Sequence, residues 1–270
     1  MNFTSVLTKM NSLPEQPVKY SLNTEQGEIF LNDFLGLDLE LKYTGEIFCI
    51  KCGKKISKSF GQGYCYPCFI TAPETEECVL RPELCKAHLG IARDMEFAKE
   101  HCLHDHFVYL ASSAEIKVGV TRSSQIPTRW IDQGASSAVK IARTPNRYYA
   151  GLIEAELKKF LPDKTNWRAM LTNKIEINPD FKKVFQLVQS VVPDNLKEYL
   201  LTELVLNEIE YPVIRYPEKV NSVDLEKQNT LMGRLIGIKG QYLIFGSNNV
   251  INLRKFSGYR INIKVNAGNI

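Results

Sequence analysis

The pattern of apolar and polar positions divides the chain into a β-rich start, a mixed centre and a β-rich end. Early runs that alternate or stay apolar between turn residues predict strands at Val18–Leu22, Glu28–Leu31 and Leu39–Tyr43. After residue 210, short β-rich runs alternate with glycine- and asparagine-containing turns. These runs are Val213–Tyr216, Leu231–Ile238, Gln241–Phe245, Val250–Leu253 and Tyr259–Val265. Short strands at this spacing predict a small barrel or sheet.

The centre of the chain begins with a strand pattern and continues with helices. Two apolar runs, Phe107–Ala111 and Ile116–Val120, are separated by a short polar stretch, which is a hairpin signal. A short helix is expected over Thr128–Gln133, because a proline precedes it and a glycine follows it. The next segment, Arg147–Leu161, has a stronger helical pattern that stops before Pro162.

Further helices and a polar connector complete the pattern. Pro179–Val192 and Pro193–Ile209 have apolar residues at helical spacing, and each begins with proline. Residues 73–106 are polar and only partly helical, with a short helix expected over Gly90–Lys99.

The order of these elements predicts an α+β protein of several segments, because 270 residues exceed the size of one small domain. The segments are residues 1–106, 107–176, 177–210 and 211–270. We expect the first to be a β-rich module, the second an α/β domain, the third helical and the fourth a small β domain.

Composition limits the classes of protein that fit. A content of 44% hydrophobic and 24% charged residues excludes a disordered chain. No apolar run approaches the roughly 20 residues that a membrane-spanning helix needs. The first 20 residues contain no apolar run of signal-peptide length. We therefore expect a cytoplasmic protein without a membrane partner.

Charge is distributed unevenly along the chain. The net charge is +4 for the whole sequence, −4 for residues 69–106 and +5 for residues 107–176. A basic segment predicts a surface that faces anions, which makes nucleic acid the expected partner. The alternative is an ordinary solvated basic face.

Cysteine and histidine are confined to one part of the chain. All 7 cysteines lie between residues 49 and 102, and all 4 histidines lie between residues 88 and 106. In a chain without an export signal, such crowding indicates metal binding before disulfides.

The first cysteine group has the spacing of a structural zinc site. Cys49 and Cys52 form one C-x2-C pair, and Cys65 and Cys68 form another. Each pair lets two thiolates from one tight turn bind the same ion, and four thiolates complete a closed tetrahedral site. The residues between the pairs predict a short hairpin with its turn at Gly61–Gly63. The alternatives are two redox-active dithiols or buried cysteines without metal.

A second zinc site is expected from the later cysteines and histidines. Its predicted ligands are Cys78, Cys85, His88 and His106. Because Cys85 and His88 are three residues apart, one helical turn can present both. Cys102 is an alternative to His106 as the fourth ligand. The other interpretation is of exposed histidines beside free cysteines.

One carboxylate lies in the apolar row of the strongest predicted helix. Ala150, Glu154, Leu157 and Leu161 share one face of that helix. If Glu154 is buried there, it needs a cation, a metal ion or hydrogen-bond donors. The alternative is an ion pair with Lys158, one turn later.

Four side chains of the central segment are of the types that metal-assisted phosphodiester hydrolysis uses. Tyr109 and Lys117 lie on the hairpin strands, Arg129 on the short helix and Glu154 on the following helix. In such chemistry a carboxylate holds Mg²⁺ or Mn²⁺, an arginine binds the phosphate, and a phenol or water-positioning group activates the nucleophile. The alternative for Arg129 is an ordinary surface guanidinium.

The order and spacing of these residues resemble the GIY-YIG endonuclease superfamily over about residues 105–175. Phe-Val-Tyr, ending at Tyr109, corresponds to the first tripeptide, and Lys-Val-Gly, ending at Gly119, corresponds to the second. Arg129 and Glu154 match the family's catalytic arginine and metal-binding glutamate. Lys117 stands where the family has its second tyrosine. The resemblance implies adjacent strands for the two tripeptides, followed by helices that carry the arginine and the glutamate.

From residue 40 onward, the chain also resembles an uncharacterised bacterial family of unknown function. The phrases that carry this resemblance are CIKCGK, SFGQGYCYPCF, RPELCKAHLG, VGVTR, RWIDQGA, TPNRYYAG, DKTNWRAML and GIKGQYLIF. The resemblance implies a bacterial intracellular protein and no particular activity.

The expected function is that of a nucleic-acid-acting protein, either a divalent-metal-dependent endonuclease or its degenerate descendant. Arg122, Arg129 and Arg147 are the expected contacts to nucleic acid, the last at a helix N-terminus. The alternatives are a non-catalytic, zinc-stabilised nucleic-acid-binding protein and a protein–protein adaptor. Convergence of Tyr109, Arg129 and Glu154 on an open cleft favours the enzyme, whereas burial of Glu154 in an ion pair favours the binding protein.

Overall fold

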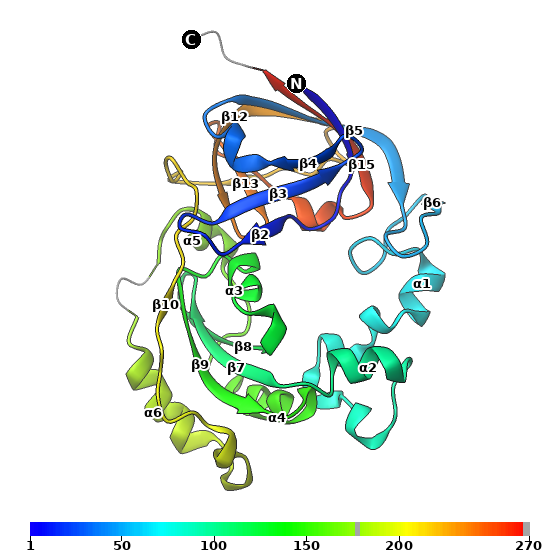
Figure 1. Ribbon diagram of the computed structural model, residues 1–270. Helices are drawn as coiled ribbons and strands as arrows, with labels where there is room; N and C mark the ends of the chain where they lie inside the picture. Colours follow the sequence, from blue (N-terminus) through cyan, green and yellow to red (C-terminus); the bar gives the residue numbers. More distant parts are fainter. Residues whose placement is uncertain (176–178, 267–270) are drawn as a thin grey trace. The chain divides into compact units, whose positions relative to one another are not determined.

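The computed structural model describes residues 1–175 and 179–266, which fall into two compact units (Figure 1). Unit 1 combines the beginning and the end of the chain, and comprises Met1–Ile70, Leu171–Asn173 and Ile209–Ile270. Unit 2 contains the centre, and comprises Thr71–Met170 and Lys174–Glu208. The expected segment boundary between residues 176 and 177 lies outside the described residues.

Unit 1 is built on an eight-stranded sheet in the order β1-β15-β5-β12-β13-β14-β11, with β6 paired to β5. The strands are β1 (Asn2–Val6), β5 (Asp38–Phe48), β6 (Lys55–Ile56), β11 (Asn221–Ser222), β12 (Thr230–Lys239), β13 (Tyr242–Phe245), β14 (Asn249–Asn252) and β15 (Tyr259–Asn266). Strand β5 is central, because Leu41 lies opposite Leu231 of β12 on one side and Ile263 of β15 on the other. All three side chains are buried, as the period of two in the sequence requires.

A second, three-stranded sheet comes from the N-terminal part of unit 1. Its strands β2 (Asn11–Leu13), β3 (Lys19–Thr24) and β4 (Gly27–Phe30) pair antiparallel in chain order. Strands β3 and β4 confirm the first two predicted strands with small shifts of their ends.

The N-terminal and C-terminal β segments, which the sequence pattern separates, share one sheet. Strand β15 lies between β1 and β5, and both pairings are antiparallel. A sheet made of the C-terminal strands alone would leave unpaired backbone groups at its edges, and β5 pairs with two of those strands. The predicted strand Val213–Tyr216 is reduced to an isolated bridge between Val213 and Gly237.

Unit 2 contains a four-stranded antiparallel sheet in the order β10-β9-β7-β8. The strands are β7 (His106–Ser112), β8 (Ile116–Arg122), β9 (Ser137–Thr144) and β10 (Asn207–Glu208). The predicted hairpin is confirmed as β7 and β8. Strand β9 was not predicted, because most of its residues are buried and the period-two alternation of a half-buried strand is weak.

Four helices follow the first strands of this sheet in the chain: α3 (Thr128–Asp132), α4 (Arg147–Leu157), α5 (Trp167–Leu171) and α6 (Phe181–Val191). Two of them, α4 and α6, share a hydrophobic core with the sheet. Ile153 and Leu157 of α4 pack with Val108, Val118 and Ile141 of the sheet. The predicted helices before Pro162 and before Pro193 are thus confirmed with shorter ends. Among the described helices, none has the length and apolar content that crossing a membrane requires.

The predicted helix Pro193–Ile209 is wrong over most of its length. A 3-10 helix forms over Asp194–Tyr199, and the chain then follows the sheet. The Leu201 amide donates to the Ile141 carbonyl at 2.9 Å, and β10 pairs with β9. The edge of β9 offers backbone partners, so strand pairing outweighs the helical spacing of the side chains.

Residues 71–105 form a connector with short 3-10 turns and one α-helix, α2 (Met95–His101). This helix begins later than the predicted Gly90–Lys99, because Asp94 caps it by accepting a hydrogen bond from the Phe97 amide at 3.0 Å. Gly90, at φ +76°, ends the preceding 3-10 turn instead. A segment with so little regular structure needs stabilisation from elsewhere.

Candidate metal centres and candidate active site

The four cysteines of the predicted zinc site lie together in unit 1. The Sγ atoms of Cys49, Cys52, Cys65 and Cys68 are all within 4.8 Å of one another. Cys52 Sγ and Cys65 Sγ are 3.9 Å apart. Two sulfurs bound about 2.3 Å from one tetrahedral ion are separated by about 3.8 Å. The donor set therefore fits zinc in both chemistry and spacing.

Two tight turns present these four ligands. The first joins β5 to β6, where the Cys49 amide donates to the Lys54 carbonyl at 2.8 Å and Gly53 adopts φ +72°. The second follows a bridge between Phe60 and Tyr64 whose turn is the predicted Gly61–Gly63. Helix α1 (Tyr66–Thr71) begins directly after Cys65 and carries Cys68.

The thiols of this site are held in an environment that favours ionisation at one position and opposes it at another. Burial raises the pKa of the Cys49 thiol, but backbone N–H groups that include those of Cys65 and Cys52 outweigh this effect and lower it to about 6. The pKa of Cys68 rises to about 12, mainly because its thiol hydrogen-bonds to Cys65. Four thiolates this close repel one another, and a bound cation removes that repulsion.

A second cluster in unit 2 contains three buried cysteines. The Sγ atoms of Cys78, Cys85 and Cys102 also lie within 4.8 Å of one another. Cys102, the alternative ligand in the sequence prediction, therefore belongs to this cluster. All seven cysteines lie in the part of the chain that the structure describes, and all are free thiols, so neither cluster contains a disulfide bond. Both clusters have donor sets that can hold a metal ion such as zinc.

The two predicted histidine ligands lie outside the 4.8 Å set, and their surroundings differ. His88 is exposed, and its ring stacks on Tyr148 with the ring centroids 4.3 Å apart. Residues 87–89 form a 3-10 turn and not the α-helical turn that would present Cys85 and His88 together. The role of His88 as a metal ligand stays a prediction.

His106 has the properties of a metal-ligating imidazole. It is 1% exposed, and its Nδ1 lies 2.7 Å from the His104 carbonyl oxygen. Its Nε2 is buried and has no hydrogen-bond partner among the described residues. Burial lowers the pKa of His106 to about 4, so the ring is neutral. An imidazole held at Nδ1 by a carbonyl, with Nε2 left over, is the usual arrangement of a zinc ligand. His106 therefore stays the predicted fourth ligand of the three-cysteine cluster.

The candidate active-site tyrosine, Tyr109 of β7, is buried and packs against β8 and α3. Tyr109 lies opposite Gly119 in the hairpin register. A Cβ atom at Gly119 would lie 2.5 Å from the Tyr109 hydroxyl oxygen, so a side chain there would displace the phenol. The hydroxyl donates to Gln133 Oε1 at 3.0 Å. Gln133, just beyond α3, is thus a neighbour whose role the sequence pattern left open.

The charges of Arg129 and Glu154 both shift the pKa of the Tyr109 phenol. Burial raises the pKa of Tyr109, whereas the adjacent Arg129 guanidinium lowers it and the Glu154 carboxylate raises it again. The residues come from β7, α3 and α4, and the fold brings them into one neighbourhood.

Lys117 belongs to the same neighbourhood. Its side chain is 3% exposed, and its Nζ donates to the Thr165 hydroxyl. Burial, together with the positive charge of Arg129, lowers the pKa of Lys117 to about 7, and Asp163 opposes this shift. A substantial fraction of the amine is therefore neutral near pH 7.

Glu154 forms the ion pair that the sequence offered as an alternative. The residue is 7% exposed, and Glu154 Oε2 lies 3.0 Å from Lys158 Nζ. Burial raises the pKa of Glu154, Lys158 counteracts this rise, and the carboxylates of Glu83 and Asp163 add to it. Glu83 was not identified from the sequence, because only the fold brings residues 83 and 154 together.

The predicted nucleic-acid contacts are less exposed than the charge pattern suggested. Arg147 donates from Nη1 to the Cys78 carbonyl at 3.1 Å and from Nη2 to the His101 carbonyl at 3.2 Å. Arg122 is half-buried, and burial together with the charge of Arg147 lowers its pKa. Contact of Arg122, Arg129 and Arg147 with nucleic acid stays a prediction.

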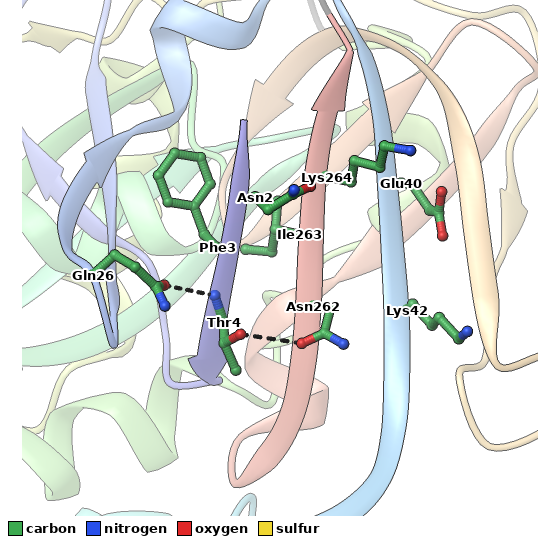
Figure 2. A pocket seen from close by; sticks show the side chains of 9 residues that line it. All are labelled: Asn2, Phe3, Thr4, Gln26, Glu40, Lys42, Asn262, Ile263 and Lys264. Carbon is green, nitrogen blue, oxygen red and sulfur yellow. Dashed lines mark hydrogen bonds between the residues drawn. The ribbon is translucent and has the colours of Figure 1, made fainter.

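Two cavities in the described structure lie apart from these residues. One has a volume of about 340 Å³ on the polar face of β1, β15 and β5 in unit 1, with Thr4, Lys42 and Lys264 among its lining side chains (Figure 2). The other, of about 410 Å³, lies in unit 2 between β9 and the start of α6. Neither contains a predicted site residue.

The fold and the sites define a mixed α/β protein with two cysteine clusters that can hold metal ions. Residues 36–261 match the family described as "protein of unknown function (DUF2797)", so the chain belongs to that family. No curated protein and no solved structure matches the chain significantly.

The four-cysteine site predicts a measurable zinc content. The purified protein should contain at least one zinc ion per chain, and the double variant Cys49→Ser/Cys52→Ser should lose about one and become poorly soluble, because a closed zinc site contributes folding energy. Metal analysis of both proteins checks this. Lys51→Ser, in the same turn, should keep the metal. Unchanged zinc in the double variant would rule out the site.

The assignment of His106 predicts mixed sulfur and nitrogen ligation at the three-cysteine cluster. His106→Ala should weaken cobalt or zinc binding there by at least about tenfold, because it removes a ligand. His88→Ala should leave it unchanged. Cobalt absorption spectra and chelator competition measure both effects. Weaker binding in His88→Ala, with no change in His106→Ala, would reverse the assignment.

Proposed function

We propose that this protein acts on nucleic acid, and that its central segment is a GIY-YIG-like domain that hydrolyses phosphodiester bonds with a divalent metal ion. The observation that carries the proposal is the gathering of Tyr109, Lys117, Arg129 and Glu154, from four different elements, into one neighbourhood. Strongly shifted pKa values at such a cluster are typical of functional sites.

The order of elements in unit 2 supports the same proposal. The hairpin β7–β8 is followed by α3, β9 and α4, so the two tripeptides lie on adjacent strands and the arginine and glutamate on later helices. This is the arrangement that the resemblance implies. The direct pairing of Tyr109 with Gly119 adds a reason for both residues, since the phenol needs a position without a side chain opposite it.

The residues suggest the following division of roles. Arg129 binds the phosphate and stabilises its developing charge. Glu154 holds Mg²⁺ or Mn²⁺, which supplies Lewis-acid stabilisation when it is bound. Tyr109, which stays protonated, helps to orient the water, and the neutral fraction of Lys117 accepts its proton, so Lys117 takes a role that belongs to a tyrosine in the GIY-YIG family.

One observation favours the second candidate, a non-catalytic nucleic-acid-binding protein stabilised by zinc. Glu154 is buried and paired with Lys158, so an ammonium group already neutralises the carboxylate that would hold the metal ion. Metal binding at Glu154 requires Lys158 to move away. If it does not, the domain retains the fold and the basic segment without the reaction.

A cleavage assay separates the two candidates. Wild-type protein should cut mixed DNA and RNA substrates with Mg²⁺ or Mn²⁺, and Glu154→Ala should abolish cutting while leaving the fold intact, as circular dichroism would verify. Arg129→Ala should lower both binding and rate, because the guanidinium contacts the phosphate in the ground and transition states.

Glu156 lies on the same helix, is half-buried and pairs with Lys159 at 2.6 Å. Glu156→Ala therefore serves as the matched control, since it also removes a carboxylate that is paired with a lysine, and it should cut normally. Equal rates for Glu154→Ala and wild type would refute the catalytic proposal. If Lys117→Tyr raises activity, the site is a degenerate form of the family's nuclease site.

Binding to nucleic acid should weaken as salt rises, because phosphate contacts release counterions. The logarithm of the affinity, plotted against the logarithm of the salt concentration, should have a clear negative slope, which Arg122→Ala makes shallower by about one contact. Fluorescence anisotropy measures it. A flat slope, or no binding at low salt, would favour the adaptor.

A further inference from the structure

The first turn of α4 is attached to the three-cysteine cluster through its backbone and its first side chain. The Arg147 amide donates to the carbonyl of Cys102 at 2.8 Å. The Arg147 guanidinium donates to the carbonyls of Cys78 and His101 at 3.1 and 3.2 Å. One residue of α4 thus holds two of the three cysteine-bearing segments.

The third cysteine-bearing segment touches α4 one turn later. A Cβ atom at Gly151 would lie 2.2 Å from the Glu83 backbone nitrogen and 2.3 Å from the Pro82 carbonyl carbon. Glycine is therefore required, because any side chain would push apart the helix and the turn between Cys78 and Cys85. Tyr148 packs against the cysteine cluster beside these contacts.

The same contacts bear on Glu154. Arg147, Gly151 and Glu154 are spaced by four and three residues, so they lie on one face of α4. Glu83, in the turn that presses on Gly151, is close enough for its charge to raise the pKa of Glu154. The segment between two cysteines of the cluster is therefore a direct neighbour of the candidate metal-binding carboxylate.

We propose that a metal ion bound by Cys78, Cys85 and Cys102 braces helix α4 and thereby sets the position of Glu154. Arg147 and Gly151 are the positioning residues, and Arg147 acts through the helix instead of contacting nucleic acid. The bracing of α4 follows from the contacts alone, whereas its importance for catalysis rests on the proposed function. The physical reason is that residues 71–105 have few regular elements, so ion binding holds the three segments in place for the helix to dock on.

Hydrogen–deuterium exchange tests the brace without reference to activity. In Cys85→Ser, or after chelation of the full-length protein, amides of α4 should exchange at least about tenfold faster, while those of β7 and β8 keep their protection. Added zinc should restore α4 in the chelated wild type. Cys52→Ser, which alters the other cluster, is the matched control and should leave α4 unchanged.

A second variant keeps all metal ligands. Arg147→Ala should retain the zinc content of the wild type and still exchange faster in the first turn of α4, and Arg147→Lys should recover part of the protection. In an active protein, Arg147→Ala should raise the Mn²⁺ concentration for half-maximal cleavage by about tenfold or more, with little change in nucleic-acid affinity.

Several outcomes would overturn the brace. Unchanged exchange of α4 in Cys85→Ser and in Arg147→Ala would do so. So would loss of protection throughout β7, β8 and β9 in both variants, since the cluster would then be a requirement for folding of the unit. If Arg147→Ala lowers nucleic-acid affinity and leaves the amide exchange of α4 unchanged, Arg147 contacts nucleic acid and does not brace the helix. A wild-type protein that never cleaves refutes the proposed function but not the exchange result.

Discussion

Thiolates within 4.8 Å of one another repel unless a cation lies among them, and this constraint acts at both cysteine clusters. In unit 1 the cluster joins the turn after β5 to the turn before α1. In unit 2 it gathers three segments between residues 78 and 102 that contain little regular structure. Hydrophobic burial alone gives such short segments little stability, and the brace proposed above assigns the stabilisation of their arrangement to a bound metal ion.

In unit 2, burial also changes the charge states of the candidate active-site residues. Desolvation lowers the pKa of Lys117 and raises that of Glu154, so it disfavours the charged form of both side chains. Lys158 satisfies Glu154 in the described arrangement. On the proposed function, a divalent ion replaces that ammonium group. The proposed enzyme and the non-catalytic binding protein then differ in which cation a single buried carboxylate holds.

Local chemistry explains which predictions succeeded. The C-x2-C pairs were predictable because each pair of ligands comes from one turn, and the β7–β8 hairpin because its apolar runs are adjacent in the chain. The two possible states of Glu154, a buried carboxylate or a partner of Lys158, were also visible, since both depend on spacing along one helix. Cys102 was foreseen only as an alternative, because its distance from Cys78 depends on how the connector folds.

The sequence by itself determined the four-cysteine set, the hairpin and the helix that carries Glu154, because each arises from residues a few positions apart. Only the tertiary structure decided that β1 and β15 share a sheet with β5, that residues after Tyr199 form an edge strand, and that Glu83 lies beside Glu154. These outcomes depend on which backbone edges and which buried surfaces meet across long stretches of chain. Side-chain periodicity does not identify these long-range partners, since the same pattern suits any strand or helix with a matching register.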